Sequence, residues 1–326
     1  MKAYRLTAEG KLSHGALSDM ETCALSPGDT LIRVRYAGLN YKDALAGQAR
    51  APIATALPVN AGIEAVGEVV ESADPAFAPG QVVIAHGMGL GVSRDGGLAE
   101  YVRAESEWLV PLPEGLDGWQ AAALGVAGFS AALAVDRLEG LGLTPGAGPV
   151  AVTGATGGVG GHAVAMLAGL GHEVVAVTSK PEAEDNLRAL GASEVIAPPA
   201  ASERMLDKGR WAGTVDTVGG APLVWLLRSA APGAALAAIG NAGGNRLETS
   251  VIPFILRGVT LTGINANAPP ALRRRIWHRM ADDLRPADPA RFARTIPPEE
   301  IDTAMALLVE GRNTGRVIAD FGATPA

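Results

Sequence analysis

Five glycines lie close together in one short segment: Gly154, Gly157, Gly158, Gly160 and Gly161. An apolar strand precedes them, a helix is expected at 159–170, and a second strand is expected at 173–178. Glycine lets the backbone pass close to phosphate groups, and the free N–H groups of the following helix face the negative charge. The segment therefore predicts a dinucleotide pyrophosphate site, the alternative being a glycine-rich turn without a ligand.

The end of the second strand carries Thr178, Ser179 and Lys180, which indicate the type of cofactor. NAD-specific sites usually place Asp or Glu here, about 20 residues beyond the glycines, to bind the ribose 2′-hydroxyl. A carboxylate would repel a 2′-phosphate, whereas two hydroxyls and an ammonium group can donate hydrogen bonds to it. We therefore expect NADPH as the cofactor. In the alternative interpretation, Lys180 is a solvated loop residue that pairs with Glu182 or Glu184.

Length, composition and charge narrow the class of protein. The 326 residues, 48% of them hydrophobic, are enough for two domains and a large core. A formal charge of −7 argues against nucleic acid as a partner. One basic cluster, Arg273-Arg274-Arg275 with Arg279, falls on an amphipathic stretch at 270–284. This position favours a solvated helix face over a binding patch.

Neither membrane insertion nor disulfide chemistry is expected. Apolar stretches are interrupted by Gly, Pro or charge before the ~20 residues that cross a bilayer, and Met1–Leu6 begins as a strand without a signal-peptide core. Cys23 is the only cysteine, so the chain can form no intrachain disulfide and no cysteine-rich zinc site. These features indicate a cytoplasmic protein without a membrane partner.

The pattern along the chain predicts an α/β protein of two domains. Residues 1–122 are β-rich, with short alternating segments between Pro-Gly turns, which indicates a small barrel. Residues 123–266 alternate helix and strand, which predicts a doubly wound parallel sheet, the Rossmann fold. Residues 267–326 are expected to return to the barrel domain. Helices are expected at 120–138, 271–284 and 298–309, and the final strand at 315–321.

Further segments are typical of one protein family. They are Gly38-Leu-Asn-Tyr-Lys-Asp43, the loop Gly89–Gly97, Leu98-Ala-Glu-Tyr-Val102, Ala127-Gly-Phe129, Trp211-Ala-Gly213, Val215–Gly220 and Pro253-Phe-Ile-Leu-Arg257. Together they resemble the medium-chain dehydrogenase/reductase superfamily, and within it the zinc-free quinone-oxidoreductase branch of the acryloyl-CoA reductase type. The resemblance covers nearly the whole chain.

The resemblance implies a GroES-like β-barrel domain beside the Rossmann domain. It implies an enzyme that uses NADPH to reduce the carbon–carbon double bond of a 2-enoyl thioester such as acryloyl-CoA. Zinc enzymes of the superfamily have a Cys-His and a His-Glu pair where this chain has Asn40-Tyr41 and Ile63-Glu64. Neither Asn40 nor Ile63 can supply these ligands, so no metal is expected. Two other functions stay open: a quinone or alkenal reductase with the same cofactor, and an NADPH-binding protein with a structural or regulatory role.

The same resemblance implies which residues bind the cofactor. They are Tyr41, Thr156, Gly157, Gly158, Val159, Thr178, Ser179, Lys180, Asn241 and Ile264. Tyr41 and Ile264 are expected at the nicotinamide, Asn241 at its ribose, residues 156–159 at the pyrophosphate and residues 178–180 at the 2′-phosphate. The chain departs from the family pattern at Pro198, at the His86-Gly-Met loop and at Ala61, which leaves the acyl specificity open.

Reduction of a conjugated thioester builds negative charge on the thioester oxygen, so it needs a donor to that oxygen and an acid for the α-carbon. In the turn at 40–43, Tyr41 is the best placed acid or donor, and Asn40 can donate an amide hydrogen bond. Asp43 can orient its neighbours, or it can cap the turn or pair with Lys42. Water is the alternative acid. His86 and Arg94 flank the glycine-rich loop that would cover the substrate, where a simple loop role is the alternative.

The assembly is expected to be a homodimer. The edge strand at 259–262, followed by Asn265-Ala-Asn267, can extend the Rossmann sheet across a two-fold axis.

Overall fold

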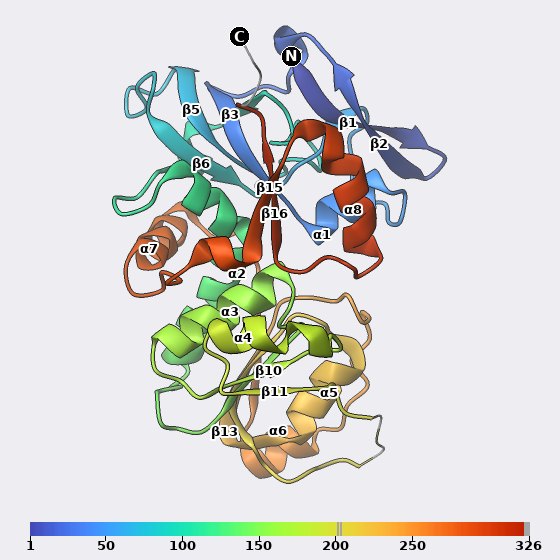
Figure 1. Ribbon diagram of the computed structural model, residues 1–326, viewed down its shortest axis with the longest axis vertical. Helices are drawn as coiled ribbons and strands as arrows, with labels where there is room; N and C mark the ends of the chain where they lie inside the picture. The colour runs from blue at the N-terminus through green and yellow to red at the C-terminus, as the bar shows by residue number, and fades with distance from the viewer. Residues whose placement is uncertain (201, 203, 323–326) are drawn as a thin grey trace. The chain divides into compact units, whose positions relative to one another are not determined.

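The computed structural model describes residues 1–200, 202 and 204–322. Contacts divide the chain into two compact units (Figure 1). The first contains Met1–Val126, Asn267–His278 and the segment from Phe292 onward, and the second contains Ala127–Ala266 and Arg279–Arg291. The expected boundary at 122/123 therefore lies shortly before the observed one. The expected C-terminal segment 267–326 is divided between the units, because 279–291 pack in the second.

The first unit is built mainly on antiparallel strands. They are β1 (Lys2–Glu9), β2 (Leu12–Asp19), β3 (Thr30–Leu39), β4 (Val59–Asn60), β5 (Glu64–Ser72), β6 (Val82–His86), β7 (Tyr101–Ala104), β8 (Val110–Pro111), β15 (Ala293–Ile296) and β16 (Arg316–Asp320). One sheet has the order β2-β1-β4, and the other has the order β15-β16-β3-β5-β6-β8, with β7 paired to β3. As expected, the last strand returns to the barrel: Val317 of β16 pairs with Leu39 of β3.

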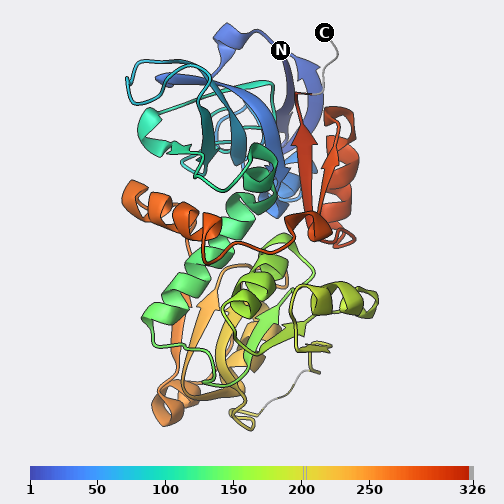
Figure 2. The ribbon, with the colours of Figure 1, turned by 60° about the vertical axis from the view of Figure 1, so that its left-hand side comes forward.

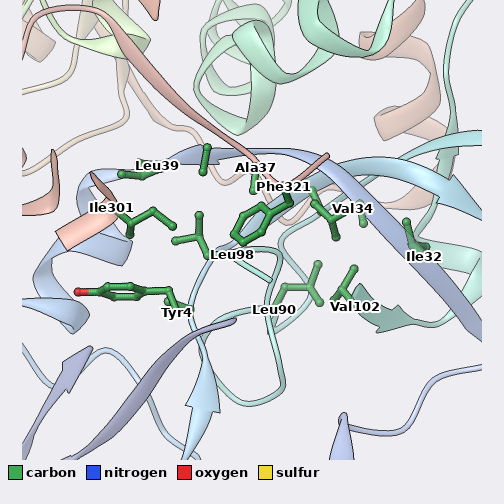
Figure 3. Packing of buried hydrophobic residues seen from close by; sticks show 14 of the residues in the cluster. Tyr4, Ile32, Val34, Ala37, Leu39, Leu90, Leu98, Val102, Ile301 and Phe321 are labelled. Atoms are coloured by element: carbon green, nitrogen blue, oxygen red, sulfur yellow. The ribbon is translucent and has the colours of Figure 1, made fainter. Parts of the chain in front are cut away.

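Apolar side chains of this unit pack into one core (Figure 3). On β3, Ile32 and Val34 are buried while Arg33 between them is exposed, which is the period of two of a half-buried strand. Ile301 of α8 (Ile301–Val309) and Phe321 pack in the same core as β3, so the C-terminal elements help to build the barrel. The other α-helices that begin in this unit are α1 (Tyr41–Gly47), α2 (Gly118–Gly140) and α7 (Pro270–Ala281).

The second unit, coloured green to orange in Figure 2, contains a parallel sheet. Its strands are β9 (Val150–Thr153), β10 (Val174–Val177), β11 (Glu194–Ile196), β12 (Trp211–Asp216), β13 (Ala230–Ala238) and β14 (Thr260–Gly263), and its helices are α3 (Gly158–Gly169), α4 (Glu184–Ala189), α5 (Gly220–Arg228) and α6 (Ile252–Arg257). The strand order β11-β10-β9-β12-β13-β14 confirms the doubly wound fold. The direction of winding reverses between β9 and β12, and ligands of such sheets bind at the carboxyl ends of the strands at this point.

The helix expected at 120–138 is α2 (Gly118–Gly140), and it is broken at Gly125, where φ is 50° and ψ is −158°. By length and composition α2 could cross a membrane, but 83% of its apolar window is buried inside the protein. This burial is typical of a core helix.

Candidate active site

The turn after β3 is held by Asp43. Asn40 and Asp43 form a capping box at the start of α1, in which the backbone N of Asn40 donates to Asp43 Oδ2 at 3.0 Å. Asp43 Oδ1 accepts from the backbone N of Ile63 at 3.1 Å. Burial raises the pKa of Asp43 to about 7, against the opposing effect of these backbone donors. Both carboxylate oxygens thus hold the turn and tie it to the start of β5.

Asn40 bridges a buried ion pair. Its Nδ2 donates to Gly38 O at 3.2 Å and to Glu64 Oε1 at 3.3 Å, and its Oδ1 accepts from Arg316 Nη1 at 3.0 Å. Both amide hydrogens and the oxygen are therefore engaged within the protein. In this geometry Asn40 positions the turn and has no N–H left for a substrate.

Tyr41 is the candidate on this turn whose polar group is free. Its side chain is 38% exposed, and within the described part of the chain its hydroxyl forms no hydrogen bond. Of the three candidate catalytic residues, Tyr41 can donate to an incoming group without breaking a bond of the fold.

The ion pair of Glu64 and Arg316 is not among the features expected from the sequence. Both side chains are buried, at 5% and 2% exposure. Arg316 also donates to Ala122 O at 3.2 Å and to Ala123 O at 3.3 Å, while Glu64 Oε2 accepts from the backbone N of Val126. The cation thus satisfies the last carbonyls of the first half of α2, and the carboxylate binds the first N–H of the second half. The C-terminal end of a helix attracts a cation and the N-terminal end attracts an anion, so each charge lies at the helix end that favours it.

The helix break beside this pair requires glycine. The φ of Gly125 is in the left-handed region, and a Cβ there would lie 2.5 Å from Glu64 Oε2 and would clash with Arg316. A signal for the pair is present in the sequence, because Arg316 opens a final apolar strand. A charge in a buried strand needs a partner of opposite charge.

The four residues expected at the pyrophosphate, Thr156–Val159, form the turn and the first residues of α3, which begins at Gly158. The first N–H groups of a helix have no intrahelical partner and are free to bind an anion. At Gly154, φ is 60° and a side chain would clash with Thr217, so this position needs glycine. Thr156 Oγ1 lies 3.4 Å from Thr178 Oγ1, so the glycine turn and the end of β10 lie together.

Thr178 and Lys180 follow β10 at the same edge of the sheet. Thr178 is buried, and its Oγ1 accepts from the backbone N of Lys180 at 3.1 Å. Lys180 is half-buried, and its pKa is lowered by burial and raised in smaller part by Glu182. Glu184, the other carboxylate considered as its partner, pairs with Arg188 at 2.8 Å.

The remaining expected cofactor residues also lie just beyond strand ends. Ser179 follows β10 and is exposed. Asn241 follows β13, is exposed, and donates from Nδ2 to Asn245 Oδ1 at 2.5 Å. Ile264 follows β14 directly, and its backbone N donates to Ala238 O at 3.0 Å. The structure thus gathers these residues at the carboxyl edge of one sheet, whereas Tyr41, Asn40 and Asp43 belong to the first unit.

A second network that the sequence did not predict supports the switch point. Asp216 is fully buried and accepts from Thr153 Oγ1 at 2.6 Å and from the backbone N of Gly219 at 2.8 Å. Thr217 Oγ1 donates to Thr153 O at 2.8 Å. Burial raises the pKa of Asp216. These bonds join the ends of β9 and β12.

The second unit also contains a cavity of about 580 Å³. Its walls are Pro198–Ala200 and Ser202 after β11, part of α5 after β12, and Gly243–Arg246 with Glu248 after β13. All these segments follow carboxyl ends of parallel strands, where such sheets bind their ligands.

His86 and Arg94 have structural roles in this geometry. His86 is buried, its Nε2 accepts from Trp277 Nε1 at 3.0 Å, and burial holds its pKa well below the usual value. Arg94 donates to Pro27 O and stacks over the Trp108 ring at 4.5 Å. These contacts support the alternative in which both residues only stabilise the loop and do not contact the substrate.

The interpretation of the basic cluster as a solvated helix face is wrong for two of its four members. Arg273 is 1% exposed. Arg279 is mostly buried and pairs with Asp136, Glu139 and Asp283. Only the other two arginines of the cluster face outward.

The residues at the superfamily's zinc position do not fit a metal. Within 1–200, 202 and 204–322, no group of three or more His, Cys, Asp or Glu side chains could hold a metal ion. The amide group of Asn40 has all its hydrogen-bonding groups engaged within the protein, and the side chain of Ile63 is apolar and cannot bind a metal. A catalytic zinc needs three protein ligands with nitrogen, sulfur or carboxylate donors.

A barrel unit that carries a polar turn and a Rossmann unit with a glycine turn define a class of nucleotide-dependent oxidoreductases. Residues 26–114 match the model of the alcohol dehydrogenase GroES-like domain, and residues 158–282 match that of the zinc-binding dehydrogenases. The chain belongs to the medium-chain dehydrogenase/reductase superfamily, in the group that contains YhdH, YhfP and AcuI.

Individual relatives are similar over nearly their whole length. The acrylyl-CoA reductase AcuI of Ruegeria pomeroyi is 42% identical, with 97% of each chain covered. The crystal structure of Escherichia coli K-12 YhdH with bound NADPH has a TM-score of 0.96 at 38% identity, and the match covers 98% of this chain and 100% of that one. Bacillus subtilis YhfP with bound NAD has a TM-score of 0.94 at 44% identity, with 98% of each chain covered.

Proposed function

We propose that this oxidoreductase uses NADPH to reduce the carbon–carbon double bond of a short 2-enoyl thioester such as acryloyl-CoA. The observation that carries the proposal is the turn at 40–43, which presents one free donor, Tyr41, on a frame of satisfied polar groups. The similarity to a protein named acrylyl-CoA reductase supports the substrate class.

When bound, NADPH would supply the hydride that the β-carbon of the substrate accepts. Tyr41 donates a hydrogen bond to the thioester oxygen, where negative charge develops, and either Tyr41 or water supplies the proton to the α-carbon. Asn40 and Asp43 hold the turn that carries Tyr41. Residues 156–159 and 178–180, with Asn241 and Ile264, bind the cofactor.

NADPH is expected to bind at least about tenfold more tightly than NADH, since one favourable charge contact is enough for such a factor. The support is the absence of a carboxylate at 178–180 and the NADPH bound to YhdH. Thr178→Asp should narrow or reverse the preference, because a carboxylate repels the 2′-phosphate and accepts from a 2′-hydroxyl. Thr178→Val, which removes the hydroxyl without adding charge, is the control. Fluorescence titration measures both affinities, and equal affinities in the unmodified protein would contradict the assignment.

A quinone or alkenal reductase is the second candidate, because the name of the relative YhfP assigns it to the quinone oxidoreductases. Initial rates with acryloyl-CoA, crotonyl-CoA and a small quinone discriminate the candidates. We expect the highest kcat/KM for acryloyl-CoA. A preference for the quinone would favour the second candidate, and turnover of none of the three would favour a structural or regulatory NADPH-binding protein.

Catalysis is proposed to be independent of metal. Because Asn40 and Ile63 cannot bind zinc, prolonged dialysis against a chelator should leave the rate unchanged. Metal analysis of the protein before and after dialysis is the control. Stoichiometric zinc, together with loss of activity on its removal, would refute this proposal.

We propose a homodimer formed through the edge strand β14 and the neighbouring α6. Val251, Ile255 and Leu256 at α6 are 65%, 70% and 66% exposed, an apolar patch beside an unpaired strand edge. Light scattering should give the mass of a dimer at micromolar concentration, and Ile255→Asp should shift it toward the monomer. Leu141→Asp, at a residue 42% exposed directly after α2 in the same unit, should leave the mass unchanged. A monomeric unmodified protein would contradict the proposal.

We further propose that the protein acts in the cytoplasm on small molecules, without nucleic acid or membrane partners. The net charge of −7 and the single exposed cysteine, Cys23, support this proposal.

A further inference from the structure

Arg273 on α7 is a buried cation without a carboxylate partner within the described part of the chain. It is 1% exposed, and its Nη1 donates to the backbone O of His86. Among the residues that the structure describes, its Nε and Nη2 have no hydrogen-bond partner. The other two buried arginines, Arg228 and Arg316, each form an ion pair. Arg273 therefore differs from the other buried arginines, because no ion pair within the described part of the chain compensates for the burial of its charge.

The two free nitrogens are on the same edge of the guanidinium group. Nε–H and one N–H of Nη2 point in parallel, and this edge is the one that binds two oxygens of a carboxylate or phosphate. The bond from Nη1 to His86 O fixes the orientation of the group. The imidazole of His86 adds no charge, because burial and the charge of Arg273 hold its pKa well below the usual value. Burial lowers the pKa of Arg273 to about 10, so it is still a cation at neutral pH.

The free edge lies near the candidate active site within the first unit. A Cβ at Gly87 would lie 3.8 Å from Arg273 Nη2. The backbone N of Gly87 donates to Ile63 O at 2.8 Å, and the backbone N of Ile63 donates to Asp43 Oδ1 at 3.1 Å. One backbone hydrogen bond and one bond to the Asp43 carboxylate thus connect the residue beside Arg273 to the turn that carries Tyr41.

We propose that the Nε–Nη2 edge of Arg273 binds an oxyanion, a carboxylate or phosphate group, through two parallel hydrogen bonds. A buried charge without a counter-charge is strongly unfavourable, so an anion that reaches it gains a large interaction. The edge is closed to solvent here, and the loop that follows β6 must move to admit the anion. Gly87, Met88 and Gly89 in this loop all have positive φ. This site goes beyond the proposed reaction and does not depend on it, because it concerns binding alone.

The test is the thermal midpoint of the protein saturated with NADP⁺, so that the phosphate sites of the cofactor are occupied. Sodium propionate and inorganic phosphate are titrated separately at constant ionic strength, with chloride as the reference. At least one anion should raise the midpoint of the unmodified protein in a saturable way. Arg273→Met should abolish this rise, and Arg274→Met, at the exposed neighbour on the same helix, should preserve it. Which anion acts distinguishes a carboxylate site from a phosphate site.

Arg273→Lys retains the charge but lacks the paired edge, so its apparent affinity should be at least about tenfold lower. Arg273→Met is expected to fold, because replacing a buried unpaired charge by an apolar side chain removes a desolvation penalty. If it does not fold, Arg273→Lys decides the question. The proposal is overturned if neither anion gives a saturable rise beyond chloride, which would leave buried water as the partner. It is also overturned if the Met or Lys variant responds as the unmodified protein does.

Discussion

Tyr41→Phe should lower kcat for acryloyl-CoA by about 10²-fold or more, the usual scale of one general acid or oxyanion donor. The reason is that Tyr41 presents the free hydroxyl of the turn, whereas Asn40 and Asp43 are fully engaged with the fold. NADPH affinity should change little, because the ring is retained. Steady-state kinetics and cofactor titration give the two quantities separately.

Tyr101→Phe on β7 is a matched control, since it removes the hydroxyl of a partly buried tyrosine away from the turn. It should leave kcat within about twofold of the unmodified value. If only the ring of Tyr41 matters, Tyr41→Phe will be nearly neutral and Tyr41→Ala will chiefly weaken cofactor binding. A fully active Tyr41→Phe would exclude Tyr41 as the acid and leave water as the proton source.

Glu64→Gln should lower the free energy of unfolding of the first unit by about 3–5 kcal/mol, because it leaves Arg316 as a buried charge without a counter-charge. The change also weakens the acceptor for the backbone N of Val126 at the start of the second half of α2. Urea unfolding measures the loss.

The control for this prediction is on the same strand. Glu68 pairs with Arg33 at 2.7 Å, and both side chains are exposed, so Glu68→Gln should cost only about 0–1 kcal/mol. Adding Arg316→Met to Glu64→Gln should recover part of the loss, because no unpaired charge remains. An effect of Glu64→Gln as small as that of Glu68→Gln would show that the buried pair does not stabilise the helix break.

The Rossmann unit could be predicted closely from the sequence. Its strands are short apolar runs that are buried on both faces, and a glycine turn between such a strand and a helix is typical of dinucleotide-binding folds. The helix expected at 159–170 is α3 at Gly158–Gly169, and the strand expected at 173–178 is β10 at Val174–Val177. The doubly wound order then follows from the alternation of helices and strands.

The break in α2 could not be predicted in this way. Gly125 is one of 42 glycines, and the apolar residues on both sides of it continue a helical pattern. What breaks the helix is a distant pair of charges, Glu64 and Arg316, whose contact with α2 depends on the folded barrel. Local patterns carry no information on such a contact.

The wrong interpretation of Arg273 has a different cause. Adjacency in the sequence groups it with Arg274 and Arg275, whereas the helical period places it with Ile276, Trp277 and Met280, all fully buried. This spacing of three, four and seven residues is readable from the sequence. Adjacent residues on a helix do not share a face.

The most direct test of the proposed reaction is the fate of the hydride. The purified protein is given acryloyl-CoA and NADPH that carries deuterium at the transferable C4 position, and the thioester product is analysed by mass spectrometry and NMR. The proposal predicts propionyl-CoA with one deuterium at the β-carbon, a solvent proton at the α-carbon and one NADP⁺ formed for each product. No propionyl-CoA, or propionyl-CoA without deuterium at the β-carbon, would contradict it.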